Sequence, residues 1–140
     1  TITRAANPDV SVALDLTAEW NKVSPENSLV QGCLVVRTEF AQQHPVEVNA
    51  FLEEYRQSVN YLTEHVTEAS EMIAAQGIFA KAAVAAKAIP NCNICYMIGK
   101  EAKTAMEAFV AIMLDVQPAS VGGASPEDDF YYIPDTGVQK

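Results

Sequence analysis

The apolar positions in residues 29–66 predict a strand followed by a helix. Residues 32–36 form a short apolar run with little alternation, which is typical of a strand buried on both faces. From Val48 to Val66 the apolar residues recur at helical spacing and form one stripe. Pro45 suits the first helical position, because its missing N–H would be unpaired there in any case. A buried strand that leads into an amphipathic helix is one unit of an α/β layer.

The rest of the chain predicts one more clear strand and several helices. Residues 10–16 alternate in part and read as a strand, followed by a short helical turn that Asp15 or Thr17 caps. The aromatic segment at residues 130–133 is either a third strand or a surface clamp. Further helices are expected at residues 67–77, 79–88 and 100–116.

This pattern gives an α/β fold of two or three strands with about four helices. Two strands do not make a stable sheet alone, since three or more are normally needed. The count therefore indicates that the remaining strands of the sheet lie outside this chain.

Composition fits one domain spanning residues 1–140. The chain is 49% hydrophobic, which supports a core and argues against disorder. It has no apolar run of the ~18 residues that a membrane helix needs, and no signal peptide at its start. Its net charge, 9 basic minus 18 acidic residues, is −9, so nucleic acid is not an expected partner.

The three cysteines do not form a disulfide framework, because their number is odd and only two lie close together. Cys92 and Cys95 make a C-x-x-C that could be a redox pair or half of a zinc site. It follows the helix-stopping Pro90 and lies in a loop, and the histidines, His44 and His65, do not cluster with it. A structural loop carrying two thiols is therefore the favoured interpretation.

Other catalytic and ligand motifs are missing from the pattern. The chain has no Gly-rich phosphate loop before a helix and no sequence sign of a nucleophile triad. The acidic residues 127–129 have the wrong spacing for a calcium loop. We therefore expect no catalytic residue, no metal and no cofactor.

Several segments carry a family resemblance. They are GCLVVRTEFAQQHP at residues 32–45, the helix VNAFLEEYRQSVNYLTEH after it, VTEASEMIAAQGI, AKAIPNCNI and SVGGASPEDDFYY. Together they resemble the C-terminal half of the substrate-binding proteins of ABC transporters, of the nitrate, sulfonate, taurine and thiamine-precursor type. The resemblance runs over residues 10–133, but the family's N-terminal half and a Glu-Pro segment are absent here.

The resemblance implies a partial periplasmic-binding-protein lobe, with this chain as the C-terminal part of lobe one. It implies an extracytoplasmic, usually lipid-anchored receptor without catalysis. Such a receptor would capture a small-molecule solute by closing its lobes and deliver it to an ABC permease.

Ligand contacts are expected in loops at the carboxyl ends of strands, where open α/β sheets bind their ligands. Trp20 follows the first predicted strand. Asn91, Cys92 and Asn93 form the irregular polar loop between two helices. These four residues are the predicted ligand-binding residues.

Two other classes of function stay open, a small thiol redox protein that uses Cys92 and Cys95, and an α/β interaction module. One further expectation concerns association. An unpaired strand edge is a template for pairing with another chain. A two-stranded sheet also leaves apolar helix faces uncovered, so the chain is expected to form a symmetric homodimer.

Overall fold

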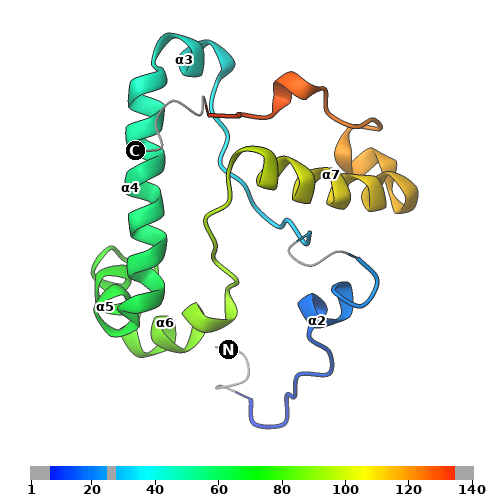
Figure 1. Ribbon diagram of the computed structural model, residues 1–140. Helices are drawn as coiled ribbons and strands as arrows, with labels where there is room; N and C mark the ends of the chain where they lie inside the picture. Colours follow the sequence, from blue (N-terminus) through cyan, green and yellow to red (C-terminus); the bar gives the residue numbers. More distant parts are fainter. Residues whose placement is uncertain (1–6, 25–27, 135–140) are drawn as a thin grey trace. The chain divides into compact units, whose positions relative to one another are not determined.

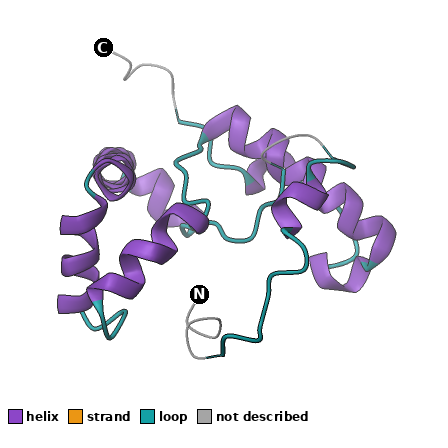
Figure 2. Cartoon of the chain, turned by 90° about the horizontal axis from the view of Figure 1, so that it is seen from below, coloured by secondary structure: helices purple, strands orange, loops and turns teal. Residues whose placement is uncertain are grey.

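The computed structural model describes residues 7–24 and 28–134, and every regular element in these residues is helical (Figures 1 and 2). None of these helices is long and apolar enough to cross a membrane. The α-helices are α2 (Leu16–Trp20), α3 (Thr38–Gln43), α4 (Pro45–Glu64), α5 (Val66–Ala75), α6 (Ala82–Ala88) and α7 (Gly99–Val116). Short 3-10 turns are η1 (Ile89–Asn91), η2 (Pro118–Val121) and η3 (Asp128–Phe130).

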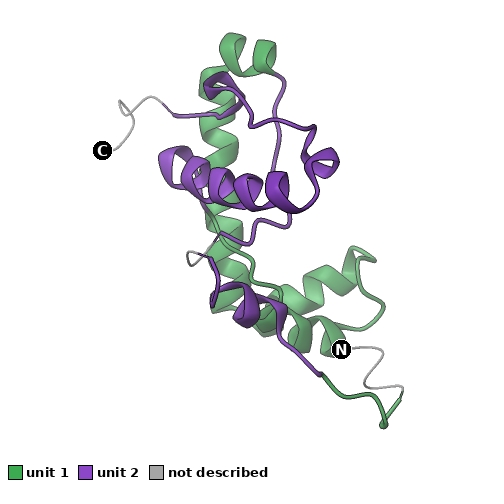
Figure 3. Cartoon of the chain, turned by 90° about the vertical axis from the view of Figure 1, so that its right-hand side faces the viewer, with its two compact units in different colours: residues 1–12, 38–96 green, residues 13–37, 97–140 purple. Residues whose placement is uncertain are grey.

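The chain divides into two compact units (Figure 3). Unit 1 comprises residues 1–12 and 38–96 and contains α3 to α6 with η1. Unit 2 comprises residues 13–37 and 97–140 and contains α2, α7, η2 and η3. The prediction of a single domain stays a prediction, and each unit is described here by itself.

The core of unit 1 lies where α4, α5, α6 and η1 meet. α5 packs along α6, and α4 contacts both α5 and η1. The long helix α4 contributes Val48 and Val59, which lie on the apolar stripe that the sequence predicts. Ile89, the first residue of η1, is also buried. Burial of these branched side chains is the main stabilising contribution available to the unit.

α5 and α6 meet through small side chains. Ala69 and Ser70 are the buried residues of α5, and Ala85, only 1% exposed, is the buried residue of α6. Small side chains at a helix contact let the two axes approach closely. The Ser70 hydroxyl donates to the Thr67 carbonyl oxygen at 2.7 Å, so its burial leaves no unpaired donor.

The end of α5 is fixed by a glycine, as the sequence predicts. Gly77 has φ +72°, a left-handed conformation that costs a glycine nothing. The Gly77 N–H donates to the Ala74 carbonyl oxygen, and the Ile78 N–H donates to the Ile73 carbonyl oxygen. This pair of bonds is a Schellman motif, which pairs carbonyls that the helix end leaves open and turns the chain toward α6.

Unit 2 is organised around α7. Its buried residue is Val110, and η2 folds back against the end of the helix. In α2 the Asp15 carboxylate accepts the N–H of Ala18 at 3.1 Å, which confirms one of the two predicted caps.

The predicted α/β fold is wrong for the residues described. Residues 10–15 and 28–37 run without regular structure, and most of their apolar side chains are exposed, with Val12 69% and Val35 82% exposed. The backbone N–H groups of Val10 and Val30 make only local hydrogen bonds, to the carbonyls of Asn7 and Ser28. β-propensity reflects packing against neighbouring strands rather than an intrinsic backbone preference, so without such neighbours an apolar run does not become a sheet.

The predicted helices do form, but several begin at other residues than expected. The helices expected from Pro45 and at residues 100–116 are α4 and α7. α5 begins at Val66 after His65, rather than after a Thr67 cap, and α6 begins at Ala82 rather than at residue 79. α3 was not predicted. The aromatic segment, expected as a strand or clamp, begins at Phe130, the last residue of the 3-10 turn η3, and contains no strand.

The contact between α5 and α6 generates a stability prediction. Ala85→Leu inserts a large side chain where only a methyl group fits, and should lower the free energy of unfolding by about 1–3 kcal/mol in urea denaturation. Ala83→Leu, at an exposed position of the same helix, is the matched control and should change it by less than about 0.5 kcal/mol. Equal effects of the two substitutions would show that the contact is not tight.

Candidate functional site

A pocket of about 170 Å³ lies in unit 1, where two breaks in the helical chain meet. One break separates α4 from α5 at His65, and the other is the passage from α6 through η1 into the following loop. The lining residues come from the end of α4, the start of α5, η1 and that loop. They are Thr63, Val66, Ile89, Pro90, Asn93 and Ile94.

The pocket is apolar with a small polar component. None of its lining residues carries a charge, and only Thr63 and Asn93 bring side-chain hydrogen-bonding groups. The Thr63 hydroxyl donates to the Asn60 carbonyl at 2.9 Å, which leaves its oxygen available as an acceptor. The pocket is a shallow hollow at the surface, since four of its lining residues are exposed and Ile89 is its buried residue.

Three of the four predicted ligand residues, Asn91, Cys92 and Asn93, belong to the segment that forms one side of this pocket. Asn93 is the one that lines it. Asn91 ends η1, where its side-chain amide donates to the Lys87 carbonyl at 3.0 Å and ties the turn to α6. Asn93 lines the pocket and has φ +50°, a left-handed backbone that asparagine tolerates better than most residues. Its role as a ligand contact stays a prediction, now with a place in the structure.

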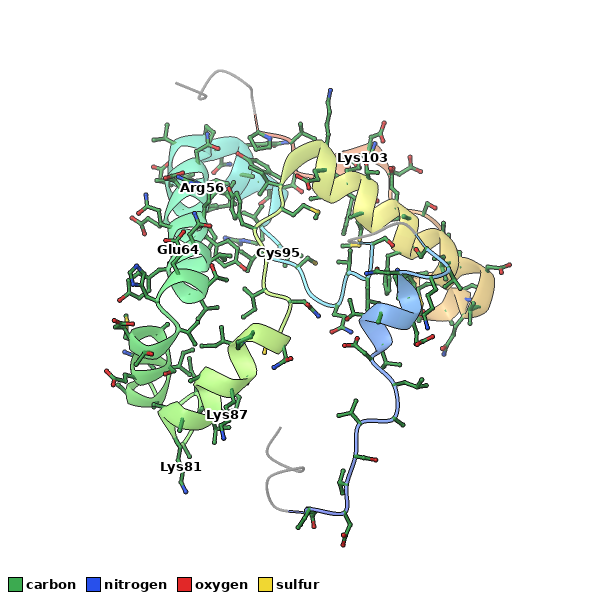
Figure 4. All side chains as sticks on the ribbon, turned by 60° about the horizontal axis from the view of Figure 1, so that its bottom comes forward. Arg56, Glu64, Lys81, Lys87, Cys95 and Lys103 are labelled. Carbon is green, nitrogen blue, oxygen red and sulfur yellow. The ribbon has the colours of Figure 1, made fainter. Side chains whose placement is uncertain are left out.

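The two thiols of the C-x-x-C are exposed and free. Cys92 follows η1, and Cys95 lies on the extended segment that leads toward α7 (Figure 4). The two residues between them, Asn93 and Ile94, are pocket residues. Among the residues described, no group of three or more potential metal ligands comes together.

Trp20 belongs to unit 2 and has structural contacts there. Its indole N–H donates to the Ser28 hydroxyl at 2.8 Å, and that hydroxyl shares a 2.7 Å hydrogen bond with Ser24. Its ring lies 5.7 Å from that of Phe109 on α7. These contacts hold α2 in unit 2 and give Trp20 a packing role, while its predicted ligand contact stays untested.

The clearest charged cluster of unit 2 surrounds Lys103 on α7 (Figure 4). Its ammonium lies 2.6 Å from a carboxylate oxygen of Asp128, 3.5 Å from Glu107 and 5.4 Å from the centre of the Tyr131 ring. The hydrogen bond between Lys103 and Asp128 raises the pKa of the Lys103 ammonium and lowers the pKa of the Asp128 carboxyl. Because the Asp128 side chain is 94% exposed, the pair positions the segment after η3 more than it stabilises the fold.

Tyr131 sits against this cluster with an unpaired hydroxyl. Its oxygen is buried and has no hydrogen-bond partner. Burial, then the nearby Glu107 carboxylate, raises the pKa of the phenol, so it stays protonated at neutral pH. A buried unpaired hydroxyl is destabilising.

On α4, Glu53 is held by two neighbours. Arg56 donates to both of its carboxylate oxygens, at 2.9 and 2.6 Å, and Gln57 donates to one at 2.9 Å. These hydrogen bonds lower the pKa of Glu53 from its usual 4.5 to about 2. Tyr96 lies near this pair, and burial raises the pKa of its phenol. Because Glu53 and Arg56 satisfy each other, neither is set up as a catalytic acid or base.

Sequence reasoning missed most of the pocket. It found both chain breaks, since a helix boundary near His65 and a stop at Pro90 are visible in the pattern. It could not show that these two breaks are neighbours in space. The residues it missed are Thr63, Val66, Ile89, Pro90 and Ile94.

One family model matches the chain. The VitK2_biosynth model, described as menaquinone biosynthesis, matches residues 2–115. No curated protein and no solved structure matches the chain.

This match corrects the functional predictions. The family is biosynthetic, so the prediction of an ABC-transporter receptor that captures a solute for a permease is wrong, and so are the transport and periplasmic-binding-fold predictions that depend on it. Neither alternative, the thiol redox protein or the α/β interaction module, gains support. A biosynthetic family also conflicts with the expectation that the chain takes no part in catalysis.

The predicted homodimer loses the argument that motivated it. It was inferred from an unpaired strand edge and from helix faces that a two-stranded sheet would leave uncovered, and no strand forms in residues 7–24 and 28–134. The extracytoplasmic location was implied by the receptor family alone and stays a prediction.

The unpaired hydroxyl generates a second stability prediction. Tyr131→Phe removes a buried group that lacks a partner and should raise the free energy of unfolding by about 1 kcal/mol. Tyr61→Phe, at a position that is 41% exposed, is the control and should change it by less than about 0.5 kcal/mol. A loss of stability in Tyr131→Phe would show that the hydroxyl is bonded in solution.

A pH prediction follows from Glu53. Since its pKa is lower in the folded chain, its contribution to α4 is fully present above pH 4.5 and is lost as the pH falls toward 2. Carbon-13 NMR of the side-chain carboxyl should show titration near pH 2 in the wild type and at a higher pH in Arg56→Gln, although the hydrogen bond from Gln57 keeps it below 4.5. Identical titration curves would mean that Arg56 does not hold the carboxylate.

Proposed function

The chain belongs to the menaquinone biosynthesis family, and on that premise we propose that it is part of an enzyme of menaquinone biosynthesis whose substrate contacts the unit 1 pocket. The single observation that carries this proposal is the extent of the match. Residues 2–115 include every residue of the pocket, whereas Asp128 and Tyr131 of unit 2 lie beyond it. The pocket thus lies wholly within the matched region.

The pocket's contribution would be to hold and orient the substrate. Its lining contains no group that titrates near neutral pH, so the pocket itself supplies no general acid or base. Orientation alone is a large catalytic effect, because it replaces an encounter in solution by a fixed geometry. Ile89, which is buried, anchors one wall of the pocket in the packed part of unit 1, while Asn93 and Ile94 contribute from the loop after η1.

The proposal is tested in cells with the full-length gene. Disrupting the gene should abolish menaquinone in lipid extracts, as measured by liquid chromatography with mass detection. The wild-type gene should restore it. Ile94→Trp, which fills the pocket from its rim, should slow menaquinone accumulation by up to about a hundredfold, the size of effect expected when a substrate is misplaced.

The matched control is Ile78→Trp. Ile78 is also an exposed isoleucine of unit 1, but it lies outside the pocket, so its substitution should restore menaquinone like the wild type. Immunoblots establish that both variants are equally abundant. Normal menaquinone after disruption would refute the biosynthetic role, and full activity of Ile94→Trp would remove the pocket from the proposal.

A further inference from the structure

Residues 124–134 of unit 2 form an arm that lies back along α7, drawn from orange to red in Figure 1. We propose that this arm opens and closes over α7, with a pair of glycines as its pivot and the ion pair of Lys103 with Asp128 as its latch. The arm follows the residues 2–115 that the family model matches, so the inference does not depend on the proposed function.

The arm runs antiparallel to α7 and covers its first turns. Asp128, near the start of the arm, pairs with Lys103 of the helix. Pro134, the last residue described, lies against Gly99, the first residue of the helix. A Cβ atom added at Gly99 would lie 3.6 Å from the Pro134 ring. The arm therefore contacts α7 at two points that lie one turn apart along the helix.

The base of the arm is η2, and its pivot is the pair of glycines that ends this turn. η2 contacts α7, and the Gln117 N–H continues the helix by donating to the Met113 carbonyl oxygen at 2.7 Å. The Gly123 N–H closes η2 by donating to the Pro118 carbonyl oxygen at 2.9 Å. Gly122 and Gly123 have φ of +80° and +82°. Glycine adopts left-handed and right-handed backbone with equal ease, so the arm leaves its base at the point where the chain can change direction most readily.

One ion pair and one ring contact latch the arm. The Lys103 ammonium lies 2.6 Å from a carboxylate oxygen of Asp128 and 5.4 Å from the centre of the Tyr131 ring. Because the Asp128 side chain is 94% exposed, water and salt screen this pair, and exposed ion pairs contribute little to stability. The latch is therefore weak, and its strength depends on the ionic strength.

The polar groups of the latch have other partners when the arm opens. Lys103 also lies 3.5 Å from Glu107 on its own helix, so it keeps an ion pair, and Asp128 is already in water. The buried Tyr131 hydroxyl has no partner in the part of the chain that the structure describes, and it would gain one from water. Burial of the Tyr131 ring favours the closed arm, whereas its unpaired hydroxyl favours the open one. Since these contributions oppose each other, the charge of the latch decides the balance between the two states.

Amide hydrogen exchange of the full-length protein, followed by NMR, measures the opening. η3 has three residues, too few for a stable helical turn without packing. The N–H groups of Phe130 and Tyr131, which donate to the carbonyls of Glu127 and Asp128, should therefore exchange when the arm leaves α7. Raising the salt concentration from about 20 mM to about 0.5 M should lower their protection factors about threefold, because salt screens the latch.

Three variants test the latch and the hydroxyl. Asp128→Asn should lower the protection of the amides at positions 130 and 131 about threefold at low salt and remove its dependence on salt. Asp129→Asn, which changes the neighbouring exposed carboxylate of η3, is the matched control and should behave like the wild type. Tyr131→Phe removes the unpaired hydroxyl and should raise the protection about fivefold. Each protection factor is referred to the exchange rate of an unstructured peptide of the same sequence.

The buried Val110 of α7 separates opening of the arm from unfolding of the unit. Its amide should stay far more strongly protected than the arm in every variant, since the open arm leaves α7 folded. Equal protection of Val110 and the arm, or no protection of the arm in the wild type at low salt, would overturn the two-state arm. Equal protection in Asp128→Asn and Asp129→Asn would overturn the latch. Lower protection in Tyr131→Phe would show that the hydroxyl holds the arm closed, contrary to the proposal.

Discussion

The close contact of α5 with α6 is the constraint on which the rest of unit 1 depends. The buried residues of the two helices, Ala69, Ser70 and Ala85, are all small, and small side chains allow a close approach of the helix axes. The glycine turn after α5 directs the chain back along the partner helix. Since η1 continues directly from α6, the same contact determines where Ile89 reaches α4. A larger side chain at Ala85 would move η1 and the pocket together.

The pocket is a consequence of this arrangement. It forms where the passage between α4 and α5 faces the proline turn after α6, so two interruptions of helical structure leave a space that no side chain fills. The ion pairs Glu53–Arg56 and Lys103–Asp128 do not line the pocket.

The sequence predicted those features that depend on local patterns. Helical spacing identified α4 and α7, and Asp15 was one of the two predicted caps for the start of α2. The strand at residues 32–36 was wrong because an apolar run reports propensity, while a sheet needs partners that the described chain does not supply. Asn93 was predicted as a ligand residue from its place in a polar loop, and it does line the pocket. The other walls could not be predicted, because their proximity depends on how α5 packs on α6.

The central claim is that the pocket of unit 1 holds a precursor of menaquinone. The most direct measurement uses the compound that accumulates when the gene is disrupted. This compound is added to the full-length protein carrying carbon-13-labelled methyl groups. The account predicts that the methyl resonances of Val66, Ile89 and Ile94 shift, while that of Ile78 does not. Saturable binding that leaves all three pocket residues unshifted would contradict it.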